Sequence, residues 1–249
     1  MPKLNLQKQT KNLKLSLKKK KINIGNTTFR VACALDISGS MNSLYRNGTM
    51  SDFVGKLLPF GMVFDDNQEI DMFAFNHGTQ EIPPATADVY DDYVGKCMRG
   101  VSVSGGTAFA PIIEEITAEY FDDIVTTQTT ERLKSGFLNK LFGKKEVETT
   151  YIHSPNTEGV PAIVFFQTDG ESGCPSEDMK AMQKASQYPI YWVMVGVGST
   201  RFPQLEYMKN TFDNVSMITV NSLSLSDEDL YDKLLSDGLD SFIKKYEVK

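Results

Sequence analysis

The sequence has few of the residues on which several common classes of protein depend. Among its 249 residues there are three cysteines, two histidines and one tryptophan. Cys33, Cys97 and Cys174 are odd in number and form no C-x-x-C pair. This argues against a disulfide framework and against a zinc site, and it indicates a reducing, cytoplasm-like compartment. His77 and His153 leave little scope for histidine-based catalysis.

Long hydrophobic runs are also missing. No apolar stretch approaches the roughly 20 residues that a membrane-spanning helix needs. Lysines interrupt every apolar run before residue 22, so no signal peptide is expected there. With 41% hydrophobic and 10% aromatic residues, the chain can still bury one large core. We therefore expect a cytoplasmic protein built around one large domain.

Acidic residues are absent from the beginning of the chain. Residues 1–21 contain eight of the 26 basic residues and none of the 32 acidic ones, which leaves 18 basic against 32 acidic residues in the remainder. Such an acidic body disfavours binding to nucleic acid. The basic tail, residues 1–21, either contacts an anionic partner or docks onto this body. Its Leu13, Leu15 and Leu17 alternate with polar residues, which predicts a half-buried strand pairing with a partner's sheet or with the domain's own edge.

From residue 22 to residue 249, apolar runs alternate with segments of helical length. The expected strands are 29–35, 69–75, 160–167, 189–197 and 215–220, with a short edge strand at 79–82; the expected helices are 49–64, 88–98, 108–124, 176–187, 203–210 and 226–245. Strands that are apolar throughout are buried on both faces. The pattern predicts an α/β fold: a doubly wound, mostly parallel central sheet with helices on both faces and one short antiparallel edge strand.

One segment interrupts this rhythm. Residues 126–159 are too numerous and too polar for a plain loop, which predicts an insertion in the domain. Within it, residues 132–145 (RLKSGFLNKLFGKK) have apolar residues at helical spacing among five basic ones. We expect a short amphipathic helix that packs on its own domain; contact with an anionic membrane surface is the less favoured alternative.

Three short motifs place oxygen-bearing side chains where strands end or helices begin. They are DISGS, with Asp36, Ser38 and Ser40; GGT, with Thr107; and TDG, with Asp169. In an open α/β sheet, functional groups collect at the carboxyl ends of the strands, where the strand order reverses. Carboxylates and hydroxyls are hard oxygen ligands suited to Mg²⁺. The motifs together therefore predict a divalent-cation site.

Each motif also has an ordinary interpretation. DISGS and TDG are compatible with simple turns, and Thr107 with a helix N-cap. Other chemistries fit less well: Gly196-Val197-Gly198 lacks the third glycine of a dinucleotide site, and no base accompanies Ser38 or Ser40. The alternative that stays open is a metal-dependent hydrolase or phosphatase that uses the same cation as a Lewis acid.

The three motifs, in this order over about residues 22–246, resemble the metal-ion-dependent adhesion site (MIDAS) of von Willebrand factor A (vWA) domains. The run YWVMVGVGSTRFPQLEYM resembles the intracellular branch of that family, which includes copines and the tellurium-resistance (Ter) proteins, and the Ter-type domains are the most similar. The beginning, LNLQKQTKNLKLSLKKK, resembles the opening of Ter stress-response proteins.

The resemblance implies a specific function. Asp36, Ser38, Ser40, Thr107 and Asp169 occupy the five metal-site positions, with the serines as direct ligands and Asp36 often acting through water. The cation would be Mg²⁺, with Mn²⁺ or Ca²⁺ as alternatives. A carboxylate from Asp or Glu of a protein partner would fill the open coordination position. We thus expect a non-enzymatic binding module of a tellurite, stress or phage-defence system, whose partners include other Ter-type proteins.

Overall fold

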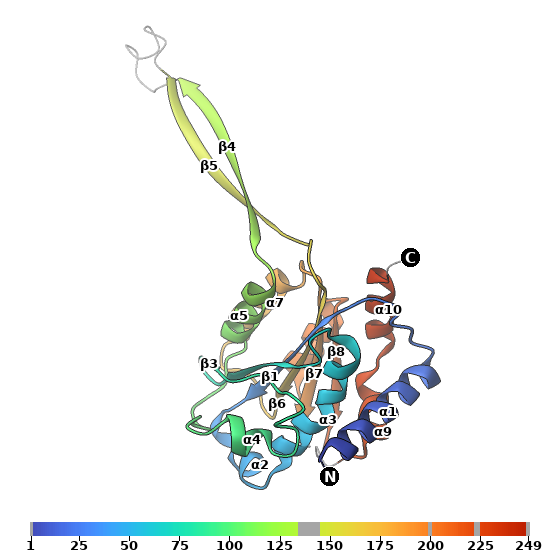
Figure 1. The fold of residues 1–249 in the computed structure, drawn as a ribbon. Coiled ribbons are helices and arrows are strands. Elements are labelled where there is room, and N and C mark those ends of the chain that lie inside the picture. The colour runs from blue at the N-terminus through green and yellow to red at the C-terminus, as the bar shows by residue number, and fades with distance from the viewer. Residues whose placement is uncertain (1, 134–144, 199–200, 222–224, 248–249) are drawn as a thin grey trace.

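The computed structural model describes residues 2–133, 145–198, 201–221 and 225–247. Its centre is a six-stranded sheet whose strands follow the order β3-β2-β1-β6-β7-β8 (Figure 1). The strands are β1 (Arg30–Asp36), β2 (Asp71–Phe75), β3 (Thr79–Glu81), β6 (Ala162–Thr168), β7 (Ile190–Val197) and β8 (Val215–Val220). Within this sheet only β3 is antiparallel to its neighbour. The predicted α/β fold with a short antiparallel edge strand is confirmed.

Helices cover both faces of the sheet. One face is covered by α1 (Pro2–Lys20), α3 (Thr49–Phe64), α4 (Tyr93–Cys97), α9 (Asp227–Leu234) and α10 (Asp237–Tyr246). The other is covered by α5 (Ala110–Tyr120), α7 (Pro175–Ala185) and α8 (Pro203–Thr211). Val31 and Cys33 pack into the first layer and Ala32 and Ala34 into the second, because successive side chains of a strand point to opposite faces. This double burial explains why β1, β6 and β7 are apolar along their lengths.

The N-terminal segment is a helix, so the predicted half-buried strand at residues 13–17 was wrong. Leu6, Leu13 and Leu17 are buried at helical spacing, whereas Leu15 is 55% exposed. The alternating pattern was misleading because Leu15 lies on the outer side of a helix. The helix packs on α3 and α9. It therefore docks on the acidic body, the other alternative considered for the tail.

The described parts of the insertion form a β-hairpin and not the expected helix. Strand β4 (Asp123–Leu133) pairs antiparallel with β5 (Lys145–Pro155), and Leu133 lies opposite Lys145. The hairpin projects from the body as a separate two-stranded arm (Figure 1). Most of the predicted amphipathic helix, residues 134–144, lies outside the described residues. Beta-branched threonine is abundant in β4 and favours the extended conformation.

Three expected helices are shorter or interrupted. The segment 88–98 forms a helix only over Tyr93–Cys97, and 108–124 only over Ala110–Tyr120. The segment 226–245 is two helices, because the Ser236 hydroxyl accepts a hydrogen bond from the Leu239 amide and begins α10. Among the described residues, no helix has the length and apolar character needed to cross a membrane.

Candidate metal-binding site

The three motifs meet at one edge of the sheet. From β1 the chain continues to β2 on one side, while β6 lies on the other side of β1. The carboxyl ends of β1 and β6 thus flank the point at which strand order reverses, where ligands of open α/β sheets bind. Asp36 is the last residue of β1, and Asp169 directly follows β6. A short 3₁₀ helix, η1 (Gly39–Met41), and α2 (Asn42–Arg46) continue the loop after β1.

Asp36 lies at the buried end of the site. Its side chain accepts a 2.7 Å hydrogen bond at Oδ1 from the Ser38 amide and a 2.6 Å bond at Oδ2 from the Thr168 hydroxyl. Burial raises the pKa of the Asp36 carboxyl; these two bonds act in the opposite direction, and the nearby charge of Asp169 adds to the increase. Keeping the buried Asp36 carboxylate ionised therefore costs free energy, and a nearby cation would reduce that cost.

Two serines connect Asp36 to Asp169. The Ser38 and Ser40 hydroxyl oxygens lie 3.1 Å apart, and the Ser40 hydroxyl donates a 2.7 Å hydrogen bond to Oδ1 of Asp169. Ser38 is buried, Ser40 is exposed and Asp169 is half-buried. The oxygens thus form a continuous cluster that runs from the interior to the surface.

The GGT loop lies against this cluster. The Gly39 amide donates to the Gly105 carbonyl at 3.0 Å, so the two loops are in direct contact. Gly105 has a φ of +85°, and a Cβ there would lie 2.8 Å from Nδ1 of His77. The Thr107 carbonyl accepts a 2.9 Å hydrogen bond from Gly173, in the loop that follows Asp169. Glycine is needed at 105 both for its backbone conformation and for the close approach of His77.

The structure therefore brings together four predicted residues, Asp36, Ser38, Ser40 and Asp169, through hydrogen bonds. The fifth residue, Thr107, is half-buried and is joined to the cluster through the backbone of its loop. His77 lies at the rim of the site beside Gly105. The side chain of the other histidine, His153, is outside the described residues.

The donor set fits a hard divalent cation. The cluster consists of two carboxylates and neutral hydroxyls, and within the described residues no group of three or more His, Cys, Asp or Glu side chains is placed to hold a metal ion. Neither Asp36 nor Asp169 forms an ion pair with a lysine or arginine in that part of the chain. Two neighbouring carboxylates without a basic partner suit a metal ion, which supplies the missing positive charge.

Three residues that support the site were not predicted. Thr168 donates to Asp36, as described above. The Tyr45 hydroxyl donates a 3.0 Å bond to the Asp36 carbonyl, and the Asn42 side-chain amide donates to the Gly39 and Val103 carbonyls at 3.1 and 2.7 Å. Thr168 is the first residue of the TDG motif, so the motif contained it although no role was predicted for it. Tyr45 and Asn42 had no sequence signal, because their role depends on where their helix packs.

Asp178 holds the helix that follows Thr107. It is fully buried on α7, and its Oδ1 accepts hydrogen bonds from the Phe109 and Ala110 amides at 2.9 and 2.6 Å. Its Oδ2 accepts a 2.6 Å bond from the Gln204 side chain on α8, whose Oε1 in turn accepts a bond from the Ser172 amide. A carboxylate suits the N-terminus of α5, where amides lack partners and the helix dipole is positive. Asp178 thereby links the GGT loop to α7 and α8.

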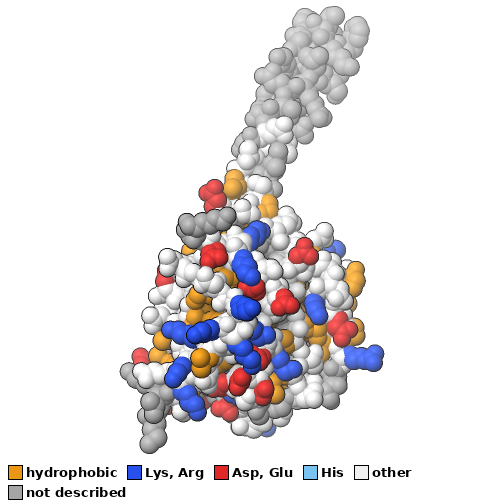
Figure 2. Space-filling model, turned by 90° about the vertical axis from the view of Figure 1, so that its right-hand side faces the viewer, with side chains coloured by type: hydrophobic (Ala, Val, Ile, Leu, Met, Phe, Trp, Pro, Cys, Tyr) orange, Lys and Arg blue, Asp and Glu red, His pale blue; other side chains and the backbone are white. Residues whose placement is uncertain are grey.

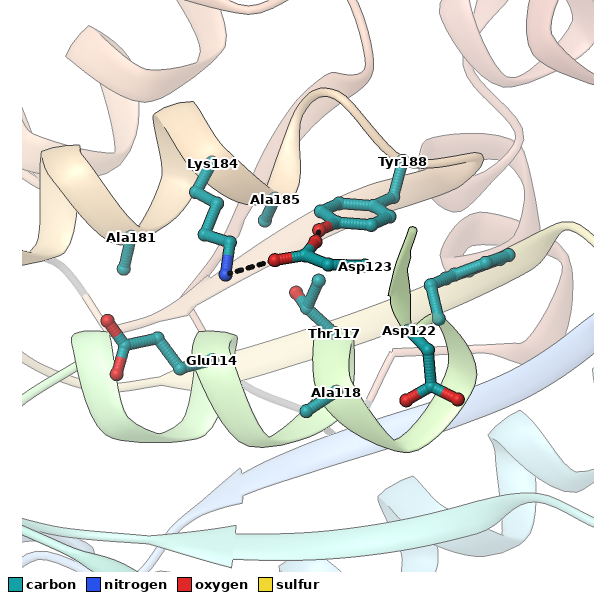
Figure 3. Close-up of a pocket in the computed structure, with 10 residues that line it drawn as sticks. Glu114, Thr117, Ala118, Asp122, Asp123, Ala181, Lys184, Ala185 and Tyr188 are labelled. Carbon is teal, nitrogen blue, oxygen red and sulfur yellow. Dashed lines mark hydrogen bonds and ion pairs between the residues drawn. The ribbon is translucent and has the colours of Figure 1, made fainter. Parts of the chain in front are cut away.

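A separate cavity of about 410 Å³ lies between α5 and α7, beside the beginning of the arm (Figure 3). Lys184 Nζ is 3.6 Å from Oδ2 of Asp123, and the Tyr188 hydroxyl donates to the same carboxylate. The lining includes Thr117 and Phe121, from the end of α5 opposite the GGT loop. It is therefore distinct from the oxygen cluster.

Comparison with known proteins identifies the fold family. A sequence model described as "vWA found in TerF C terminus" matches residues 28–249. The chain belongs to this vWA-TerF-like family. The vWA-TerF-like chain is also similar to "Uncharacterized protein YcbR" of Bacillus subtilis (strain 168), with 26% identity over 245 residues, which cover 95% of this chain and 85% of that protein.

Solved structures show the same vWA fold at low sequence identity. Proximal thread matrix protein 1 from the mussel byssus superposes with a TM-score of 0.54 at 15% identity, covering 87% of this chain and 49% of that chain. An aerotolerance-related membrane protein from Bacteroides fragilis NCTC 9343 gives 0.52 at 17% identity, covering 87% and 99%. The Plasmodium vivax TRAP protein gives 0.51 at 14%, covering 88% and 74%. The vWA-TerF-like chain spans about half the length of the byssus protein.

Proposed function

We propose that this chain is a metal-dependent protein-binding module. Asp36, Ser38, Ser40, Thr107 and Asp169 hold one divalent cation, Mg²⁺ or alternatively Mn²⁺ or Ca²⁺. The observation that carries the proposal is the hydrogen-bonded oxygen cluster from Asp36 through Ser38 and Ser40 to Asp169 at the point where strand order reverses. Two structures with this fold support it, because they are described as a byssus protein "with zinc occupied MIDAS motif" and a "manganese-loaded" TRAP protein.

The same cluster accounts for binding of a partner's carboxylate. Hydroxyl ligands are neutral, so two carboxylates leave the cation with affinity for a further anionic oxygen. Ser40 and the half-buried Asp169 form the outer end of the cluster, where that oxygen can reach the cation. The partner therefore presents an Asp or Glu side chain. No chemical step is needed, and the module is non-enzymatic.

Membership of the family suggests the cellular system in which the module acts. Because the chain belongs to a family named for TerF, its partners include other Ter-type proteins in a cytoplasmic tellurite or stress-resistance system, or in a phage-defence system. The direct test is a pull-down from cells that carry such a system, performed in parallel in Mg²⁺ and in EDTA. Partners retained only in Mg²⁺, and lost with Asp169→Ala, are the expected result.

Calorimetry tests the metal site itself. Mg²⁺ and Mn²⁺ are titrated into the wild type, into the double variant Asp36→Ala/Ser38→Ala, and into Ser43→Ala as an exposed control on α2. We expect binding by the wild type and the control but not by the double variant. Equal binding by all three proteins, or by none, contradicts the proposal. Metal-dependent phosphoester hydrolysis that is lost with Asp169→Ala would instead identify a hydrolase.

A further inference from the structure

Helix α1 precedes the part of the chain that the family model matches, and it packs on α3 and α9. Leu13 and Leu17 are buried. The Gln9 side chain donates a 3.0 Å hydrogen bond to Asp227 and accepts a 2.6 Å bond from the Tyr90 hydroxyl. These contacts reach both α9 and the segment before α4. The outer face of α1 therefore points away from the domain.

That outer face is basic. Its exposed lysines share the side of the helix opposite the buried leucines; they are Lys8, Lys11, Lys14 and Lys18. Within the described residues, Lys19 is the α1 lysine that pairs with acidic groups, at 3.3 Å from Glu228 and 3.4 Å from Asp232. Figure 2 shows Lys and Arg side chains across the middle of the molecular face on which α1 lies, with Asp and Glu side chains among them. The positive charge of the outer lysines is therefore available to an external partner.

An apolar groove of about 440 Å³ runs along this lysine face. Leu6 and Thr10 of α1, Met62 of α3 and Ala87 form its lining, and Gln7, Lys11 and Lys14 are also part of it. Among the residues that the structure describes, no acidic side chain lines it. An apolar groove beside the ammonium groups of Lys11 and Lys14 offers two different contacts at once, burial for a hydrophobic side chain and pairing for a carboxylate.

We propose that this groove, which we call the α1 groove, binds an acidic, amphipathic segment of a protein partner. An apolar side chain of that segment enters between Leu6, Met62 and Ala87, while its carboxylates pair with Lys11 and Lys14. Burial of the apolar side chain supplies most of the affinity. Exposed ion pairs contribute little each, but they select an acidic partner and speed association.

Charge and shape favour a protein segment over two other anionic partners, a membrane surface and nucleic acid. A membrane-bound amphipathic helix inserts its apolar face, but the buried leucines of α1 are already packed on α3 and α9. Nucleic acid presents phosphates over a long surface, and the remainder of the chain, with 32 acidic residues against 18 basic ones, repels it. Of these three partners, a protein segment is the one that combines carboxylates with a side chain that fills an apolar groove.

The test is a selection from a random-peptide phage library on the full chain in EDTA. EDTA removes any contribution from a carboxylate bound to a metal at Asp36 and Ser38, so the outcome is independent of the function proposed above. The probe for measurement is the most enriched peptide, labelled for fluorescence anisotropy. Enriched peptides should combine Asp or Glu with Leu, Phe or Met.

Three variants separate local recognition from general electrostatics. Lys11→Glu/Lys14→Glu should weaken binding of the peptide at least about tenfold, corresponding to roughly 1.4 kcal/mol. The control Lys180→Glu/Lys209→Glu makes the same change in net charge on exposed residues of α7 and α8, beyond the opposite face of the sheet, and should alter binding less than about twofold. Gln7→Trp fills the groove without changing charge and should also weaken binding. Circular dichroism verifies that each variant is folded.

Several outcomes would overturn the proposal. They are a selection without enrichment, enriched peptides that lack acidic residues, and equal losses in the α1 and control double variants. Phosphatidylserine vesicles or duplex DNA that bind the wild type more tightly than the peptide, with loss in Lys11→Glu/Lys14→Glu, would assign the face to a membrane or to nucleic acid instead.

Discussion

The Ser40 hydroxyl donates a 2.7 Å hydrogen bond to Oδ1 of Asp169, although the two residues are 129 positions apart in the chain. The bond joins the loop after β1 to the loop after β6. Asp169 therefore depends on Ser40 for its orientation, and a cation at this site would share oxygens that are already in contact. Loops that are arranged in advance lose less conformational entropy when a ligand binds.

Removal of the Ser40 hydroxyl should weaken metal binding without unfolding the protein. In Ser40→Ala, Asp169 loses its hydrogen-bond donor and the cation loses a ligand, so we expect affinity for Mg²⁺ to fall by at least about tenfold. Ser40 is exposed, and the free energy of unfolding should change by no more than about 0.5 kcal/mol. Calorimetry and urea denaturation measure the two effects. Ser43→Ala should change neither, and a large loss of stability in Ser40→Ala would argue against a binding role.

Asp178 should affect both the stability of the fold and the metal site. Asp178→Ala leaves two amides at the start of α5 without an acceptor and should cost about 1–2 kcal/mol of stability. It should also weaken Mg²⁺ binding, because α5 begins at Ala110, shortly after Thr107. The exchanged pair Asp178→Asn/Gln204→Glu keeps one donor and one acceptor between α7 and α8 and should restore part of both properties. Glu177→Gln, on an exposed neighbour, is the control. Unchanged Mg²⁺ affinity in Asp178→Ala would limit Asp178 to a structural role.

The packing of α1 predicts unequal effects of two leucines. Leu13→Ala removes a fully buried side chain and should lower the free energy of unfolding by about 2–5 kcal/mol. Leu15→Ala alters a side chain that is 55% exposed and should have an effect within about 0.5 kcal/mol. Both are measured by urea denaturation. Equal effects would agree with the alternating strand pattern and contradict the helix.

Asp65 should give the stability a characteristic dependence on pH. Burial raises the pKa of its carboxyl, while hydrogen bonds from the Val31 and Asn67 amides and the charge of Arg30 counteract this in part. Because the folded state then binds the proton more tightly than the unfolded state, stability falls as pH rises from about 4, the unfolded value, through the raised folded pKa. Asp65→Asn cannot titrate. Relative to this variant, the wild type should lose stability over that interval in EDTA, as measured by urea denaturation across pH. A difference that is constant or that has the opposite sign would contradict the raised pKa.

The central sheet and the oxygen motifs were predictable because their signals are local. Burial on both faces requires apolar strands, and this requirement made the β1, β6 and β7 segments visible in the sequence. The DISGS and TDG motifs each begin at the last residue of such a strand. Segments without two-sided burial were less predictable. Exposed Leu15 completed an alternating pattern, so the N-terminal helix was predicted as a strand. Residues 126–133 and 145–155 showed no pattern that indicated the hairpin.

The sequence by itself determined the α/β architecture and the five residues predicted to bind metal, because strand burial and the spacing of short motifs are properties of neighbouring residues. Tertiary structure alone decided that Ser40 meets Asp169, that Thr168 and Tyr45 support Asp36, and that Asp178 caps α5. It also decided which side of α1 is buried and where the α1 groove lies. These relationships join residues from distant parts of the chain, and their geometry is set by how helices and strands pack rather than by any local preference.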